Sequence, residues 1–163
     1  MRATGTDQGL VWDTLNGLTS FIVPGPDVYS VAQGISSSKP GGVDTGITEI
    51  LMAICLAQPS SSPESLAAEA VTGLLNRVAR RINPMTCGQF ASPFACLSFA
   101  EKVAVFALIQ QHPSMTLFHE LSALRFFVQT TLACSEIAGP ISEPVNPAEW
   151  RQGWIVGRHS GVC

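Results

Sequence analysis

The side chains that could do acid–base chemistry in this 163-residue chain are few and lie far apart. Its histidines are His112, His119 and His159, and none belongs to the His-Glu-x-x-His zinc motif. An enzyme built on this chain would have to use His119 with Glu120, or a thiol such as that of Cys134. A histidine at this place in an apolar helix is more often a hydrogen-bonded core residue, and we expect that of His119. The sequence predicts no catalytic residue and no metal site.

Glycine patterns that bind phosphates are also missing. The chain has neither a Gly-x-Gly-x-x-Gly cradle nor a Gly-x-x-x-x-Gly-Lys-Ser/Thr loop. Gly41, Gly42 and Gly46 lie where a helix is expected to begin, and their amides could hold an anion there. We favour a turn, since glycine supplies the backbone conformations that turns need.

The cysteines are spaced too widely for a Cys-x-x-Cys motif. A disulfide between Cys87 and Cys96 would close a short loop and would require an oxidising compartment. The favoured interpretation is that most of them are small buried side chains with free thiols. The five are Cys55, Cys87, Cys96, Cys134 and Cys163.

Apolar periodicity predicts the elements that position these groups: an all-α, single-domain bundle of about five helices. A long loop rich in Gly, Pro and Ser is expected after the first helix, over residues 24–43. Residues 6–140 form the helical core of the one domain spanning 1–163, and 141–163 an extended, irregular tail. The expected helices cover about 6–23, 44–58, 62–83, 98–111 and 114–137.

The last two helices are the most apolar. A capping box of Ser98 and Glu101 opens the fourth, whose apolar run predicts an interior position with Lys102 facing solvent. Polar residues of the fifth form one narrow strip that includes Arg125 and Gln129. A helix apolar over the rest of its circumference must be surrounded. We therefore expect it at the centre of the bundle, or else with one flank against a partner.

The composition points to a protein that binds another protein. Only 13% of the residues are charged and 46% are hydrophobic, whereas ordinary domains carry about 25% charged residues. A surface so poor in charge must expose apolar area, which usually marks an interaction site and favours self-association when no partner is present. The net charge of −3 offers no basic stripe for nucleic acid. The longest apolar runs, Ile50–Ala57 and Val103–Ile109, fall far short of the roughly 20 residues of a membrane span.

Tyrosine, tryptophan and arginine dominate interface energetics, and they guide the choice of partner-binding residues. The arginines could equally form a solvated helix face, and the two tryptophans could pack the tail onto its own domain. The predicted partner-binding residues are Tyr29, Val31, Arg77, Arg80, Arg81, Trp150 and Trp154.

Several short motifs recur in the order found in one known family. The chain resembles the small-subunit family related to gluconate 2-dehydrogenase subunit 3 over roughly residues 10–140. It departs from that family in lacking a twin-arginine leader and a Tyr-Gly-Gly-Asn ending, near which Gly139-Pro140 stands. The motifs are Phe21-Ile22-Val23-Pro24-Gly25-Pro26-Asp27, Gly42-Val43-Asp44, the segment from Phe90 to Phe94, and Leu97-Ser98-Phe99-Ala100-Glu101-Lys102-Val103-Ala104-Val105-Phe106 before a Phe-rich helix.

The resemblance implies a non-catalytic accessory subunit that binds and stabilises a large FAD-dependent dehydrogenase or oxidase of the glucose–methanol–choline type. FAD would belong to the partner, and no catalytic residue is carried over to this chain. The expected location is the cytoplasm, or outside it by export with the partner, because the chain shows no intact signal peptide. The alternative is a stand-alone helical binder of an apolar, sterol- or lipid-like molecule, with its pocket between the third and last helices.

Overall fold

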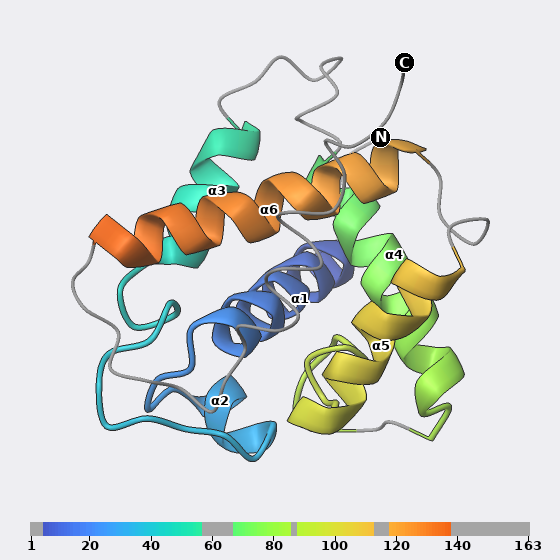
Figure 1. Ribbon diagram of the computed structural model, residues 1–163, viewed down its shortest axis with the longest axis horizontal. Coiled ribbons are helices and arrows are strands. Elements are labelled where there is room, and N and C mark those ends of the chain that lie inside the picture. The colour runs from blue at the N-terminus through green and yellow to red at the C-terminus, as the bar shows by residue number, and fades with distance from the viewer. Residues whose placement is uncertain (1–4, 57–66, 86–87, 113–117, 138–163) are drawn as a thin grey trace, which may run out of the picture.

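The computed structural model describes residues 5–56, 67–85, 88–112 and 118–137, and the regular elements in these ranges are all helices (Figure 1). The predicted all-α bundle is thereby confirmed. Among the described residues, no helix has the length and apolar character that a membrane span requires. The elements are α1 (Gly5–Ile22), α2 (Val28–Ala32), α3 (Ile47–Leu56), α4 (Ala67–Ile82), α5 (Phe99–Gln111) and α6 (Phe118–Ile137).

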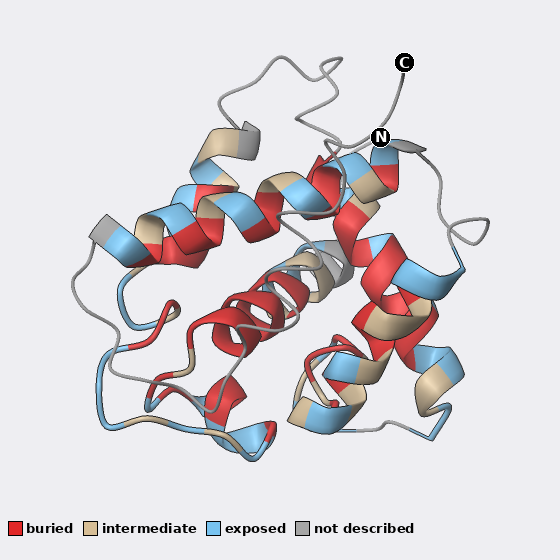
Figure 2. Ribbon diagram, viewed as in Figure 1, coloured by how far each residue is buried: buried red, intermediate tan, exposed pale blue. Residues whose placement is uncertain are grey.

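The core forms where α1 and α4 meet the other helices. The apolar stripe of α4 is fully buried at Val71, Leu74, Leu75 and Val78, and α4 packs against α1, α3, α5 and α6. The second half of α1 is buried along its length and runs through the middle of the bundle (Figures 1 and 2). Each such side chain contributes about 1.5–3 kcal/mol when it leaves water, so this stripe accounts for much of the fold's stability.

Aromatic rings join α5 to α1. Phe21 stacks on Phe106 with the ring centres 5.2 Å apart, and it also meets Phe99 at 4.9 Å. Phe94, just before α5, meets Phe106 edge-on at 6.3 Å. The predicted capping box at the start of α5 is confirmed, since Ser98 and Glu101 satisfy each other's backbone amides.

The segment predicted as a loop over 24–43 contains the short helix α2. The next helix, α3, starts at Ile47 and not at Asp44, because Gly46 adopts a φ of +75° that interrupts the helix. The Asp44 carboxylate instead accepts a hydrogen bond from the Gly41 amide at 2.9 Å, and the Gly42 amide donates to the Val23 carbonyl at 2.9 Å. These amides are satisfied within the chain, so the glycines form a turn and not an anion site.

Within residues 24–43, the backbone at Gly25 crosses the backbone at Gly41 in direct contact. A Cβ on Gly25 would overlap the backbone of Gly41, and a Cβ on Gly41 would overlap Gly25. The carbonyl of Gly25 also accepts a hydrogen bond from the Ser37 amide at 3.1 Å. The crossing thus needs residues without side chains at both places.

The interior positions predicted for the last two helices are wrong. α6 lies on the outside of the bundle, with one exposed strip that includes Arg125 and Gln129 and a buried face that includes Leu124 and Phe127 (Figure 2). α5 likewise exposes Val103, by 38%. In a bundle this small, most helices have one buried face and one exposed face. Alanine, threonine and half-buried apolar residues can therefore occupy the exposed face. The predicted helix start at residue 62 and the extended tail lie outside the described residues.

Candidate functional site

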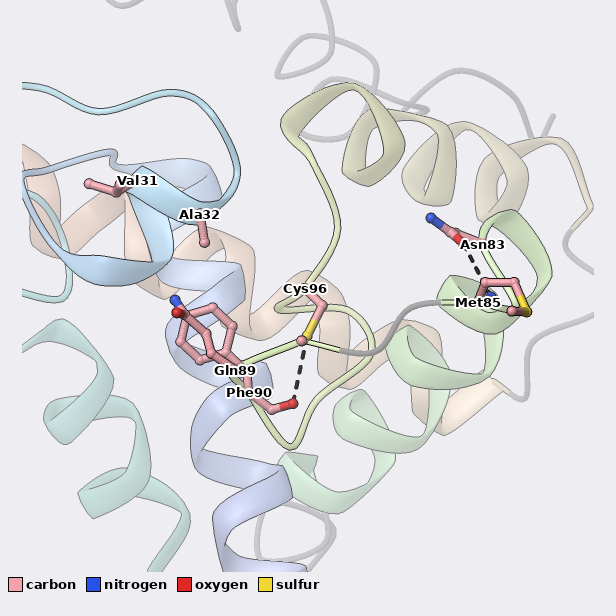
Figure 3. Close-up of a pocket in the computed structure, with 8 residues that line it drawn as sticks. Val31, Ala32, Asn83, Met85, Gln89, Phe90 and Cys96 are labelled. Carbon is pink, nitrogen blue, oxygen red and sulfur yellow. Dashed lines mark hydrogen bonds between the residues drawn. The ribbon is translucent and has the colours of Figure 1, made fainter.

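A pocket of about 500 Å³ opens between α2 and the chain that follows α4. In Figure 3, Val31 of α2 and Met85 after α4 lie on opposite sides of it, with Cys96 between them. Val31 is 61% exposed and Met85 is 82% exposed, so both present apolar area to solvent at the edge of the pocket. The lining residues are Val31, Ala32, Asn83, Met85, Gly88, Gln89, Phe90 and Cys96.

The carboxylate of Asp27 fixes the start of α2. It accepts hydrogen bonds from the amides of Tyr29 and Ser30, both at 2.9 Å, and from the Ser30 hydroxyl at 2.6 Å. The Ser30 hydroxyl in turn accepts from the Gly25 amide at 3.0 Å. A five-residue helix is not stable by itself, so this cap, worth about 0.5–2 kcal/mol, is a large part of what holds α2.

Tyr29 joins α2 to the pocket floor with its side chain buried, and its assignment as a partner-binding residue stays a prediction. Its ring stacks on Phe90 with the centres 4.3 Å apart. Its hydroxyl donates to Asp13 at 2.7 Å and accepts from Asn16 at 3.3 Å. Burial, followed by the hydrogen bond to Asp13, raises the pKa of Tyr29 to about 12. The phenol is therefore a neutral structural group at ordinary pH.

Asn76 of α4 positions the segment that forms the pocket's inner wall. Its side-chain amide donates to the Thr14 hydroxyl at 2.8 Å and to the Thr72 carbonyl at 3.0 Å. Its oxygen accepts from the Ser92 hydroxyl at 2.8 Å and from the Phe94 amide at 3.0 Å. Every hydrogen-bonding position of the side chain is used, so α1, α4 and residues 92–94 are held in one arrangement.

Lys102 of α5 lies beneath this wall and is fully buried, so the prediction that it faces solvent is wrong. Its amine donates to the Gln33 side-chain oxygen at 2.8 Å and to the Gly17 carbonyl at 3.2 Å. It also lies 5.4 Å from the centre of the Phe94 ring. Burial, partly offset by the charges of Asp27 and Cys96, lowers the pKa of Lys102 to about 7. Burial thus favours the neutral form of this amine.

Cys96 is a free thiol, half-buried in the pocket wall. Its sulfur donates to the Phe90 carbonyl at 3.6 Å. Cys87, its partner in the alternative disulfide, lies outside the described residues. A Cβ on Gly88 would lie only 2.7 Å from the sulfur, so the glycine lets the chain pass close to Cys96.

The residues considered for acid–base chemistry are arranged differently from the expectation. His119 is exposed, which corrects the prediction of a core histidine. Glu120 is buried and pairs with Arg77 of α4, with a shortest distance of 2.8 Å and a second contact at 3.1 Å. The hydrogen bond to Glu120 raises the pKa of Arg77. Arg77 therefore joins α4 to α6 while leaving 43% of its side chain exposed.

The other predicted partner-binding residues are only partly brought together. Arg80 and Arg81 are exposed in the last turn of α4, just before the chain reaches the pocket at Asn83. Trp150 and Trp154 lie outside the described residues. Among the predicted residues that the structure describes, Val31 lines the pocket.

Comparison with protein-family models, with curated proteins and with solved structures finds no match to the chain. The resemblance to the gluconate 2-dehydrogenase subunit 3 family therefore stays a prediction. In the described part of the chain, no three metal-ligating side chains come together. No sequence motif singles out Asp27, Asn76 or Lys102 for the roles they have here, although Lys102 is spaced from Val105 and Ile109 as residues on one helix face are.

Proposed function

We propose that this chain is a non-catalytic accessory subunit that binds and stabilises a large FAD-dependent dehydrogenase or oxidase. The partner would supply the FAD and the catalytic residues. The proposal combines the family resemblance with a surface on the described part of the chain that suits a protein partner.

The observation that carries it is the apolar rim of the pocket. Val28 and Val31 lie three residues apart on α2 and are 60% and 61% exposed, and Met85 is 82% exposed across the pocket from Val31. Apolar side chains around a cavity are anchors that a partner can cover. α2 is capped and its tyrosine is buried, so the rim is preorganised and loses little entropy on binding.

The pocket favours a protein over a sterol or lipid. The alternative function placed an apolar cavity between the third and last helices, where α4 and α6 instead pack through buried side chains such as Leu75 and Leu124. The cavity at α2 is lined in part by the polar side chains of Asn83 and Gln89. A partner side chain with its own hydrogen-bonding groups suits such a lining better than a hydrocarbon does.

The test is co-expression with large FAD-dependent oxidoreductases of the glucose–methanol–choline type, followed by affinity purification and measurement of bound flavin. The wild-type chain should co-purify a flavoprotein. The double variant Val31→Ser, Met85→Ser should retain its melting temperature but lose about tenfold or more in affinity, as expected when two anchors worth about 1 kcal/mol each are removed.

The matched control is Ile50→Ser on α3, which alters a 45% exposed apolar residue away from the pocket. It should bind like the wild type. Absence of any flavoprotein with the wild-type chain contradicts the proposed function. Equal weakening by the control contradicts the assignment of the surface, and a bound apolar molecule in native mass spectrometry would support the alternative.

A further inference from the structure

One buried amine joins three separate elements of the bundle. Lys102 reaches from α5 to the Gly17 carbonyl of α1 and to the side chain of Gln33, the C-cap residue of α2. Gln33 also donates to the Ser20 carbonyl at 2.9 Å and accepts from the Phe99 amide at 2.8 Å. The end of α2 is therefore attached to the bundle through Gln33, and Lys102 lies at the centre of that attachment.

The surroundings of this amine match its neutral form. A neutral amine has two hydrogens to donate, and two acceptors face it. An ammonium has three, and only the ring of Phe94 is left for the third. The ionisable groups that act on it are Asp27, at the other end of α2, and Cys96, in the segment before α5. α1 offers it an uncharged carbonyl, and the carboxylate of Asp27 is already engaged with the amides of α2.

We propose that Lys102 is a proton-sensitive latch: as a neutral amine it holds α2 against the bundle, and α2 is released when this amine takes up a proton. The latch belongs to the free chain. Its consequence for partner binding rests on the proposed function, because α2 carries Val28 and Val31.

The direction of the pH effect follows from proton balance. When α2 is released, water reaches Lys102 and its pKa returns to the ordinary value near 10.5. Between about pH 7 and pH 10 the closed form is neutral and the released form is charged, so release takes up one proton. Each pH unit downward in that range should favour release tenfold. Below pH 7 both forms are charged, and the equilibrium should stop changing.

Amide hydrogen exchange of the free wild-type chain tests this, with each rate corrected for its intrinsic pH dependence. The amides of Val31 and Gln33, which bond within α2, should be less protected than those of Leu75 and Val78 in α4. Their protection factors should rise about tenfold per pH unit from pH 7 to pH 9. In Lys102→Met that slope should vanish.

A second variant keeps the test decisive if Lys102→Met does not fold. Gln33→Glu places a carboxylate against the amine and should keep it charged in the closed form, so the slope should again flatten between pH 7 and pH 9. A wild-type protection factor that does not change with pH overturns the latch. So does an unchanged slope in either variant, or equal protection in α2 and α4, which would mean that the amine is exposed only by global unfolding. None of these results depends on a partner.

Discussion

At the scale of single residues, the side chain of Asn76 shows how a buried amide can fix a loop. It is 3% exposed and bonds to α1, to its own helix and to the segment of Ser92 and Phe94. In an apolar interior each of these groups would otherwise lose its bonds to water without replacement. The amide thus selects one loop arrangement among the many that the apolar core alone would tolerate.

Replacing this amide should therefore cost much more than replacing an amide near the surface. Asn76→Ala leaves the Phe94 amide and the Ser92 hydroxyl without their partner, and we expect a loss of about 3 kcal/mol or more in unfolding free energy. The measurement is chemical denaturation monitored by circular dichroism.

The control is Asn83→Ala, whose half-buried side chain bonds to Glu101 at 2.8 Å. It should cost about 1 kcal/mol or less. If the two variants lose the same stability, the network around Asn76 is not what holds the loop.

Some residue roles were predictable from the sequence, and others were not. The Ser98 and Glu101 cap was predictable because both partners lie within one turn. The charge of Lys102 predicts exposure, whereas its spacing from Val105 and Ile109, which are buried on the same face, predicts the burial that the structure shows. Asn76 and Ser92 are 16 residues apart, and no local pattern reports a bond over that separation.

At the scale of elements, α1 and the segment before α5 approach each other closely at Gly17. A Cβ on Gly17 would lie 2.9 Å from the Cα of Ala95, nearer than real side-chain atoms come to a backbone. The absent side chain at Gly17 thus sets the distance between α1 and the residues that lead into α5.

Two glycines in helix interiors should therefore respond oppositely to alanine. Gly17→Ala should destabilise the fold by about 1–3 kcal/mol through overpacking, despite the better helix propensity of alanine. Gly73→Ala, on the exposed side of α4 with open space around it, should stabilise it by up to about 1 kcal/mol. Thermal and chemical unfolding of both variants check this, and a destabilised Gly73→Ala would show that α4 tolerates less than its surroundings suggest.

Most helices were predictable and the shortest was not. The apolar stripe of α4 and the capping box of α5 are local sequence signals, and the structure contains both. α2 has only five residues, too few to display a period, and it lies between glycines and prolines that resemble a loop. Only its tertiary attachments through Asp27, Tyr29 and Gln33 make it a helix, and these depend on residues elsewhere in the chain.

At the scale of the whole molecule, the chain has few charged residues, yet its exterior is not entirely apolar. Much of the described surface is formed by Ala, Gly, Ser, Thr and amide side chains. Three of the exposed large apolar residues, Val28, Val31 and Met85, belong to α2 and the pocket rim. The large apolar residues exposed in the described part of the chain are Trp12, Val28, Val31, Ile50, Met85 and Val103.

Two buried groups should shape the pH dependence of global stability in opposite directions. Unfolding returns the Lys102 pKa from about 7 to 10.5, so the unfolded chain binds more protons in this range and stability should rise from pH 7 toward pH 10, by at most about 1.4 kcal/mol per unit. Unfolding also returns the Tyr29 pKa from about 12 to 10.0, so the contribution of the phenol is complete below pH 10 and is lost between pH 10 and pH 12.

Denaturation series across this pH range check both signs. Lys102→Met should remove the rise above pH 7, and Tyr29→Phe should reduce the fall above pH 10. A wild-type stability that declines steadily from pH 7 would mean that Lys102 is already charged in the folded chain at neutral pH.

The backbone crossing of Gly25 and Gly41 supplies a criterion for detecting distant kinship. A mutation at one of these positions cannot be compensated at the other, because a Cβ at either would meet main-chain atoms of the other glycine, and one at Gly25 would also meet the Asp44 carboxylate. Any descendant that retains the crossing must therefore inherit both glycines, with the Asp44 carboxylate closing the turn behind them. This pair, joined to an aspartate three residues after the second glycine, would identify lineage members even where the rest of the sequence has diverged.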